Sequence, residues 1–364
     1  MGGTGSQRTG QQCNGNDSAA PHPPDVSHVS SVRQPVPASL SGTEGFSRFS
    51  ENARASTFPG TGRLPYGAAM AATHPPAWFT SAIATDARAT HIDVDDCAIH
   101  ALSWGDTDKP GLVLVHGGAA HARWWSFIAP QLTHQYHVAA LDLSGHGDSG
   151  HRDRYDMEQW AREVLGVAGA LGMDRPITVG HSMGGFVTMV TAAVHGDDIA
   201  GTIIIDSPVR RPDPETEEAN RGRAFSNPKT YPSLDEAMEH FHLVPPQPCE
   251  NRYIVDHIAR HSLRETPAGW TWKFDRGVFD RFAAHELHEY LSMVKTRVAV
   301  LHGQFSAIVT QEVTDHMSEV LGRNAPFVEI PQAHHHVPLD QPLALIAALR
   351  ALLADWEHSI PTRG

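Results

Sequence analysis

The stretch 178-TVGHSMGGFVTMV-190 decides how this chain is interpreted, because it sets one serine among glycines. The apolar, β-prone residues before Ser182 predict a strand, and the run after it predicts a helix. A sharp turn between the two would force Ser182 into strained backbone dihedral angles and present its hydroxyl at the carboxyl end of a sheet. Gly180 and Gly184 supply the small neighbours that such a crowded turn needs. The alternative is a serine that only caps the helix.

Short apolar runs alternate with helix-like segments on both sides of this stretch. Continuous apolar runs are typical of parallel strands that are buried on both faces. Their alternation with helices predicts an α/β fold built on a doubly wound, mostly parallel sheet. The predicted parallel strands lie in 111-GLVLVHGG-118, 136-YHVAALDLSGHG-147, 177-ITVGHS-182, 201-GTIIIDSP-208, 297-RVAVLHG-303 and 326-PFVEIP-331.

The segment that follows the strand ending near Asp206 differs from the rest of the sheet region. Residues 208–290 are rich in proline and charged residues and are mostly helical in pattern. This composition predicts a helical cap inserted between two strands of the sheet. The predicted sheet domain therefore comprises residues 77–207 and 291–364.

The N-terminal 76 residues have little apolar character to bury. Residues 1–76 open with Gly, Ser, Gln, Asn and Pro, and such a segment cannot offset the entropy cost of ordering. We expect this extension to be disordered. Met70 begins a stretch with the character of an ordinary protein start, so residues 1–69 are interpreted as an extended start or a dispensable arm.

Composition limits the classes of partner. The 364 residues carry a net charge of -13, from 41 acidic and 28 basic residues, without any Lys/Arg-rich run. Nucleic acids and anionic membranes are therefore poor candidates, and a small-molecule substrate is expected. The three cysteines are far apart and lack CxxC spacing, which argues against a disulfide framework or a zinc site. No apolar run reaches the ~18–20 residues needed to span a bilayer. A cytoplasmic protein without a membrane span is the expectation, and the oligomeric state is left open.

A second glycine-rich turn strengthens the interpretation of the serine. The motif HGG at 116–118 follows the first predicted parallel strand. If Ser182 attacks a carbonyl, the tetrahedral oxyanion requires two backbone N–H donors. We expect one from Met183, the residue after the nucleophile, and the other from Gly118, with Ala119 as the second choice. A strand-end turn without a catalytic role is the alternative.

The end of the chain supplies candidates for the base. The segment 330-IPQAHHHVPLDQP-342 follows the last predicted strand, where the order serine, acid, histidine places the base. His334, His335 and His336 are all candidates. A polar loop or a metal-binding histidine tract is the alternative. Adjacent histidines on an irregular loop point in different directions, which favours a single base over three ligands of one metal.

Together these motifs resemble the α/β-hydrolase superfamily, over about residues 90–358. The resemblance rests on HGG, LDLSGHGDSG, GHSMGG and the histidine-containing end. In relatives the last motif often has the form P-G-A-G-H, which implies that His335 is the catalytic histidine when it is aligned with residues 331–335. Gln332 and His334 replace the usual glycines here, so His334 is kept in reserve. The resemblance also implies that the turn at 142-DLSGHGDS-149 is structural.

The acid is the point at which this chain departs from the family pattern. Relatives usually carry an aspartate shortly after the penultimate strand, but 303-GQFSAIVTQE-312 has Ser306 near that position. Some branches of the family place the acid after the earlier strand, where this chain has Asp206. We therefore expect Asp206 to orient the histidine, with Glu312 as the alternative.

These residues predict a serine hydrolase that cleaves a carboxylic ester or lactone of a small, largely apolar substrate through an acyl-enzyme. No metal or other cofactor is implied. Trp124, Trp125 and His181 are expected to line the substrate pocket, although aromatic residues of this kind also serve as core packing. An acyltransferase, a C–C bond hydrolase and a cofactor-free peroxidase use the same nucleophile. A non-catalytic ligand-binding protein on the same fold is the alternative of another class.

Overall fold

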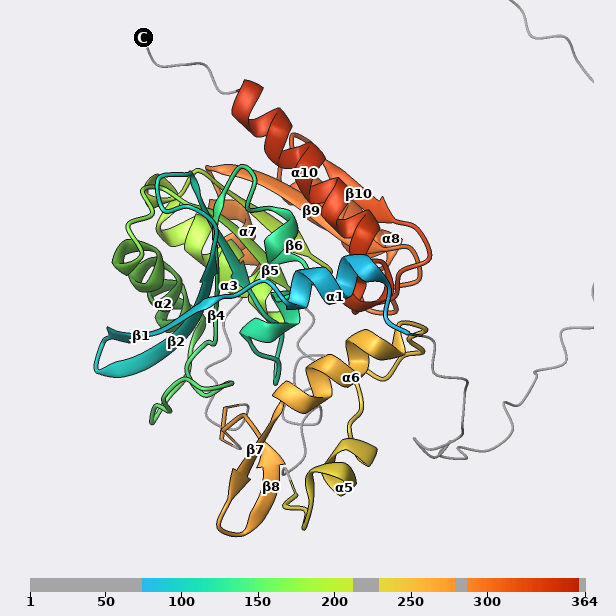
Figure 1. Cartoon of the computed structure of the whole chain (residues 1–364). Coiled ribbons are helices and arrows are strands. Elements are labelled where there is room, and N and C mark those ends of the chain that lie inside the picture. The colour runs from blue at the N-terminus through green and yellow to red at the C-terminus, as the bar shows by residue number, and fades with distance from the viewer. Residues whose placement is uncertain (1–73, 212–228, 276, 279–286, 360–364) are drawn as a thin grey trace, which may run out of the picture. The chain divides into compact units, whose positions relative to one another are not determined.

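The computed structural model describes residues 74–211, 229–275, 277–278 and 287–359. The N-terminal extension expected to be disordered lies outside these ranges except for its last three residues. In the described part of the chain, eight strands form one sheet in the order β1-β2-β4-β3-β5-β6-β9-β10 (Figure 1). The strands are β1 (Arg88–Val94), β2 (Cys97–Trp104), β3 (Gly111–Val115), β4 (His137–Leu141), β5 (Ile177–His181), β6 (Gly201–Ile205), β9 (Arg297–Gly303) and β10 (Phe327–Ile330).

The direction of the strands confirms the prediction of a mostly parallel sheet. β2 pairs antiparallel with β1 and with β4, while every other neighbouring pair in the sheet is parallel. The carboxyl ends of β3, β5, β6 and β9 therefore meet at one edge, which is where loops of a doubly wound sheet carry functional residues. All five residues of each of the strands β3, β4, β5 and β6 are buried.

Both faces of the sheet are covered, as the continuous apolar strands predict. Leu112 and Leu114 of β3 face one cluster, and the alternate residues Val113 and Val115 face another. The first cluster draws on α1 (Ala77–Ile83) and α10 (Pro342–Ser359), and the second on α2 (Met157–Ala170) and α3 (Met183–Val194). No helix in the described ranges is both long and apolar enough to cross a membrane.

The turn after β4 is structural, as the sequence predicts. Asp142 accepts hydrogen bonds from the amides of Ala122 and Asp148 and from the ring of His100, at 2.5–2.8 Å. Gly147 has φ +56°, and a Cβ at this position would overlap the Asp142 carboxyl group. One buried carboxylate therefore links strand β2 to the loops that follow β3 and β4.

The described part of the segment between β6 and β9 is mostly helical in its regular elements, as predicted, and adds a short hairpin that the sequence analysis did not predict. This part contains α5 (Leu234–Glu239), α6 (Arg252–His261) and α7 (Leu287–Met293), together with a hairpin of β7 (Leu263–Thr266) and β8 (Gly269–Trp272). The hairpin closes at Gly269, whose φ of +117° is accessible to glycine at little cost. The sequence Gly-Trp-Thr-Trp has high β propensity, but its shortness hides it among the helical segments. Residues 212–228, 276 and 279–286 of this segment lie outside the described residues.

A buried ion pair ties the first hairpin of the sheet to α2. The Nε atom of Arg152 lies 2.9 Å from Oε1 of Glu163, whose side chain is fully buried. The same guanidinium donates to the backbone carbonyls of Val94 and Asp95 at 2.6 and 2.7 Å. Burial raises the pKa of Glu163, opposed by hydrogen bonds from Ser144 and by Arg152. The Ser144 hydrogen bonds and the Arg152 guanidinium both favour the ionised form of this buried carboxyl group.

Replacement of Arg152 by alanine is expected to destabilise the protein strongly. It leaves the Glu163 carboxylate buried without its cation, a change that costs about 3–5 kcal/mol. The midpoint of urea denaturation should fall accordingly. Arg162→Ala is the matched control, because Arg162 on the exposed face of α2 pairs with Asp95 in the turn between β1 and β2, and its loss should cost less than about 1 kcal/mol. Equal midpoints for the two variants would contradict this reading of the buried pair.

Candidate active site

Ser182 occupies the tight turn between β5 and α3, where the sequence places it. Its backbone angles are φ 56° and ψ -122°, a strained combination for a residue with a Cβ and worth about 1–3 kcal/mol. A Cβ at Gly180 would overlap the backbone of Gly184, and one at Gly184 would overlap the carbonyl oxygens of Val115 and His116. Only glycine fits at these two positions, so the surrounding backbone holds the serine in its strained conformation.

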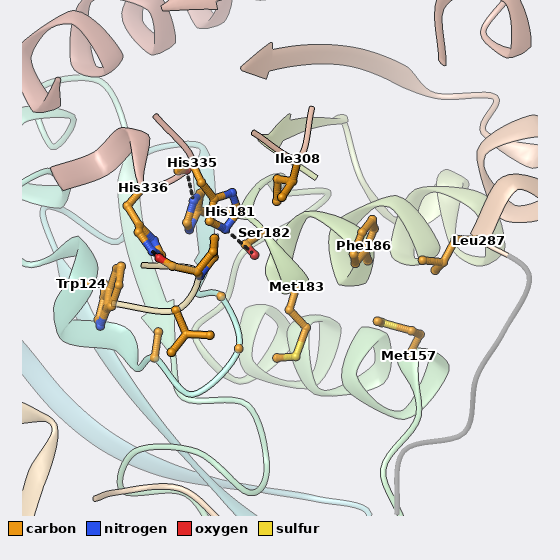
Figure 2. A pocket seen from close by; sticks show the side chains of 15 residues that line it. Trp124, Met157, His181, Ser182, Met183, Phe186, Leu287, Ile308, His335 and His336 are labelled. Atoms are coloured by element: carbon orange, nitrogen blue, oxygen red, sulfur yellow. Dashed lines mark hydrogen bonds between the residues drawn. The ribbon is translucent and has the colours of Figure 1, made fainter. Parts of the chain in front are cut away.

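The structure brings Ser182 together with His335 and Asp206. The Oγ atom of Ser182 lies 3.0 Å from Nε2 of His335 (Figure 2). On the other side of the ring, Nδ1 of His335 lies 2.7 Å from Oδ2 of Asp206. A carboxylate can only accept, so Nδ1 carries the proton and Nε2 accepts the hydrogen bond from the serine hydroxyl. This tautomer is the one in which the histidine can take the serine proton.

Asp206 is held rigidly at the end of β6. Its side chain is fully buried, and its backbone has φ +50°. The Gly303 amide donates to Oδ1 at 2.9 Å, and the Ser306 hydroxyl donates to Oδ2 at 2.7 Å. Ser306 stands where relatives usually carry the aspartate. Because β6 and β9 are parallel neighbours, their ends meet, and the carboxylate reaches the histidine from one strand earlier.

His334, the reserve candidate for the base, and Glu312, the alternative acid, do not contact Ser182 or His335 through any hydrogen bond or ion pair between described residues. His334 turns to Asp340: its amide and its Nδ1 atom lie 2.8 and 3.3 Å from the carboxylate oxygen Oδ2, and its side chain is partly exposed. Glu312 lies exposed in the first turn of α8 (Gln311–Val320). Among the described residues, His335 contacts neither the Glu312 carboxylate nor any carboxylate other than that of Asp206.

The loop after β3 lies against the serine. A Cβ at Gly117 would come within 3.2 Å of the Cβ atom of Ser182. Gly118 and Met183 both line the cavity in front of the serine, whereas Ala119, the second choice, does not. No backbone hydrogen bond between described residues uses the Gly118 or the Met183 amide as its donor. Both N–H groups are therefore available to an oxygen atom in that cavity.

Ser182 and His335 open onto a cavity of about 290 Å³. Figure 2 shows Trp124 and His336 on one side of the serine and Met157, Phe186 and Leu287 on the other. The full set of lining residues is Gly117, Gly118, Ala120, Trp124, Met157, His181, Ser182, Met183, Phe186, Val244, Pro245, Leu287, Ile308, His335 and His336.

Two of the three expected pocket residues line this cavity. Trp124 and His181 do so, but Trp125 is only 1% exposed and packs in the core with Phe127 and Ile128. The short helical turn that carries both tryptophans (Ala122–Trp125) points them in different directions, which the sequence alone does not reveal.

Most of the apolar residues that line the cavity were not predicted from the sequence. The sequence could have indicated Phe186, because this residue lies four positions after Ser182 and therefore on the same face of α3. Met157 is the first residue of α2, and only the packing of α2 against α3 brings it to the site. Val244 and Leu287 come from the inserted segment, whose path over the sheet no local pattern fixes.

Histidines are the only ionisable side chains with an ordinary pKa near neutrality among the described residues that line the cavity. Among the described residues that line it, none is Lys, Arg, Asp or Glu. Burial lowers the pKa of His181 well below its usual range, with a further contribution from His335. Burial likewise lowers the pKa of His336 to about 3. Both rings are neutral near pH 7, so the lining favours an uncharged, apolar ligand.

Comparison with known proteins gives the same answer for the fold and the class of activity. The sequence pattern described as "Alpha/beta hydrolase family" matches residues 112–349. An esterase from Mycobacterium tuberculosis is 25% identical over 265 residues, which cover 70% of this chain and 86% of that protein. A bifunctional esterase/perhydrolase from Acinetobacter calcoaceticus is 25% identical over 253 residues, 67% of this chain and 91% of that protein. The crystal structure of E-2-(acetamidomethylene)succinate hydrolase superposes with a TM-score of 0.65 at 18% identity, covering 74% of this chain and all of the other.

Proposed function

This chain belongs to the alpha/beta hydrolase family, and from that premise we propose that it is a serine hydrolase that cleaves carboxylic esters or lactones of small, uncharged, largely apolar compounds. The observation that carries the proposal is the continuous line of hydrogen bonds from Ser182 through His335 to Asp206, opening onto an apolar cavity. A buried carboxylate behind the histidine is what a serine needs to act as a nucleophile at neutral pH.

In the proposed reaction, Ser182 Oγ attacks the carbonyl carbon while its proton passes to Nε2 of His335. The Gly118 and Met183 amides donate to the oxyanion, and the Asp206 carboxylate stabilises the imidazolium. The imidazolium then returns the proton to the departing alcohol oxygen as the C–O bond breaks. In the second half, His335 takes a proton from water as the water oxygen attacks the acyl carbon. The imidazolium then returns that proton to Ser182 Oγ as the acyl C–O bond breaks, which releases the carboxylic acid.

The same proton transfer orients the substrate. The leaving oxygen has to approach Nε2 of His335, whose ring lies 4.8 Å from the ring of His336, centroid to centroid. The alcohol portion is therefore assigned to the side of the cavity bounded by His336 and Trp124. The acyl chain then extends towards Met157 and Phe186. The flexible thioether side chain of Met157 can adapt to acyl chains of differing length.

Truncation of Phe186 to alanine is expected to change the preference for acyl chains selectively. In a series of p-nitrophenyl esters that differ only in acyl length, kcat/KM for the preferred chain should fall about tenfold, and the optimum should move to longer chains. Trp124→Ala is the matched control on the opposite side, and it should lower kcat/KM for every ester by a similar factor. A shift of the optimum in Trp124→Ala, with none in Phe186→Ala, would reverse the assignment of the two sides.

The activity itself is tested with short p-nitrophenyl esters and a fluorophosphonate probe. Hydrolysis of the esters together with labelling of the protein at Ser182, located by peptide mass analysis, is the expected result. A folded protein that neither hydrolyses the series nor reacts with the probe would favour the ligand-binding alternative on the same fold.

A further inference from the structure

Three buried histidines from two distant parts of the chain meet beside Ser182. His181 ends β5, while His335 and His336 lie in the loop between β10 and α9 (Val337–Asp340). One ring nitrogen of each lies within 4.8 Å of one ring nitrogen of each of the others. Their ring centroids are 4.8, 4.9 and 5.9 Å apart, and Figure 2 shows the rings gathered next to the serine.

Hydrogen bonds fix the tautomer of every ring in this cluster. His181 Nε2 donates to the carbonyl oxygen of His335 at 2.8 Å, and His336 Nε2 donates to the carbonyl oxygen of Pro245 at 3.1 Å. His335 Nδ1 donates to the Asp206 carboxylate at 2.7 Å. All three acceptors are oxygens that carry no proton, so the second nitrogen of each ring retains its lone pair. The three lone pairs belong to His181 Nδ1, His335 Nε2 and His336 Nδ1.

This arrangement is the one that histidine ligands of metal ions usually show. In metal sites the free ring N–H typically donates to a carboxylate or a backbone carbonyl, which orients the ring and makes the ligating nitrogen more basic. One of the three lone pairs is without any partner: His336 Nδ1 is buried and forms no hydrogen bond with the described residues. A buried polar atom left unsatisfied costs free energy, which a bound cation would recover.

We propose that His181, His335 and His336 form a site for a first-row transition-metal dication of the Zn²⁺ type, and that an ion bound there inhibits the enzyme. Three imidazole nitrogens suit Zn²⁺, Co²⁺ or Cu²⁺ and not Mg²⁺ or Ca²⁺, which prefer oxygen. A tetrahedral ion about 2.0–2.1 Å from each nitrogen requires nitrogen separations of about 3.4 Å. One ring nitrogen of each histidine lies within 4.8 Å of one of each of the others, so side-chain rotations would have to bring the three lone pairs to that spacing.

Inhibition follows from the identity of the shared ligand. The His335 Nε2 lone pair accepts the serine proton in the proposed mechanism, and the same lone pair would bind the metal. The ion and the Ser182 hydroxyl proton therefore compete for one atom, and Ser182 Oγ or a water would complete the coordination. This inhibitory consequence rests on the proposed function, whereas binding of the ion does not.

Binding is tested with Co²⁺ in untagged protein, because a low-symmetry Co²⁺ site absorbs strongly in the visible range. The visible absorption is expected to saturate at one Co²⁺ per chain in the wild type and in Ser182→Ala. Added Zn²⁺ should displace the Co²⁺ and remove this absorption. His336→Gln and His181→Gln retain an amide donor for the carbonyl oxygens but lose the ring lone pair, and each should weaken Kd by more than about 100-fold. His334→Ala is the matched control, because His334 points to Asp340 and should leave Kd unchanged.

The possible results distinguish failure of the proposed metal site from failure of the proposed hydrolase activity. Absence of the absorption in folded wild type, its retention in both Gln variants, or its loss in His334→Ala would overturn the site. If the site stands and the wild type hydrolyses esters, Zn²⁺ should abolish hydrolysis at the concentration that displaces Co²⁺, and a chelator should restore it. Full activity with the site occupied would overturn the inhibitory role alone. A wild type that binds Co²⁺ but is inert towards esters would instead refute the proposed function.

Discussion

Replacement of Ser182 by alanine is expected to lower kcat for a short p-nitrophenyl ester by about a millionfold, to the residual level that the oxyanion amides and binding provide. The hydroxyl is the atom that forms the acyl-enzyme, and no neighbouring group in the cavity replaces it. Alanine shares the Cβ that strains this position, so the turn between β5 and α3 should keep its shape. The measurement is the initial rate across substrate concentrations, with a thermal unfolding curve to confirm that the variant folds.

The chain contains a matched control for this experiment. Ser126 Oγ lies 2.8 Å from Nε2 of His257, a second serine–histidine pair that is outside the cavity. The Ser126 hydroxyl donates to the Arg123 carbonyl oxygen and accepts from His257, so Ser126→Ala removes a serine hydroxyl beside a histidine without removing a nucleophile, and it should leave kcat within about twofold of the wild type. Loss of activity in both variants, or retention of more than a thousandth of the rate in Ser182→Ala, would show that the nucleophile is another group.

The serine and the histidine could be predicted from sequence because each is marked locally. A strand, a tight Gly-x-Ser-x-Gly turn and a helix place Ser182 without reference to any distant residue. The three adjacent histidines narrowed the base to a single loop. Among the three, only the resemblance to the family favoured His335, because the direction of each ring depends on Asp340, Asp206 and the Pro245 carbonyl, which the loop sequence does not encode.

The acid illustrates why sequence could rank candidates but not decide between them. Asp206 and His335 are separated by 129 residues, and their contact depends on the lateral order of β6, β9 and β10 in the sheet. From the sequence, a carboxylate after either of two neighbouring strands is consistent with the same site. The hydrogen bond between Ser306 and Asp206 shows how close these two positions are in space.

The inserted segment was the least predictable part, for a physical reason. Its hairpin is only four residues per strand and its helices are short, so tertiary packing and not local periodicity determines their boundaries. Val244 and Pro245 line the cavity, and nearby Gln247 and Asn251 hydrogen-bond to the end of α9. Part of the cavity lining therefore comes from the part of the chain whose fold is hardest to derive.

Asp206→Asn should lower kcat by roughly 10⁴-fold while leaving KM and the fold almost unchanged. The asparagine amide would donate to Nδ1 of His335, so the ring proton would move to Nε2 and face the serine. The ring would keep its position but could no longer accept the serine proton. Steady-state kinetics with one short ester, beside a thermal unfolding curve, measures this effect.

Two further variants make the assignment of the acid decisive. Glu312→Gln removes the rival carboxylate from the exposed turn of α8 and should change kcat by less than about twofold, as surface changes remote from a site do. Ser306→Asp in the Asp206→Asn background should recover part of the lost rate, because the Ser306 hydroxyl already lies 2.7 Å from the oxygen that contacts His335. Recovery would show that the site requires one carboxylate at this point in space, whichever of the two parallel strands supplies it. A larger loss in Glu312→Gln than in Asp206→Asn would transfer the role to Glu312.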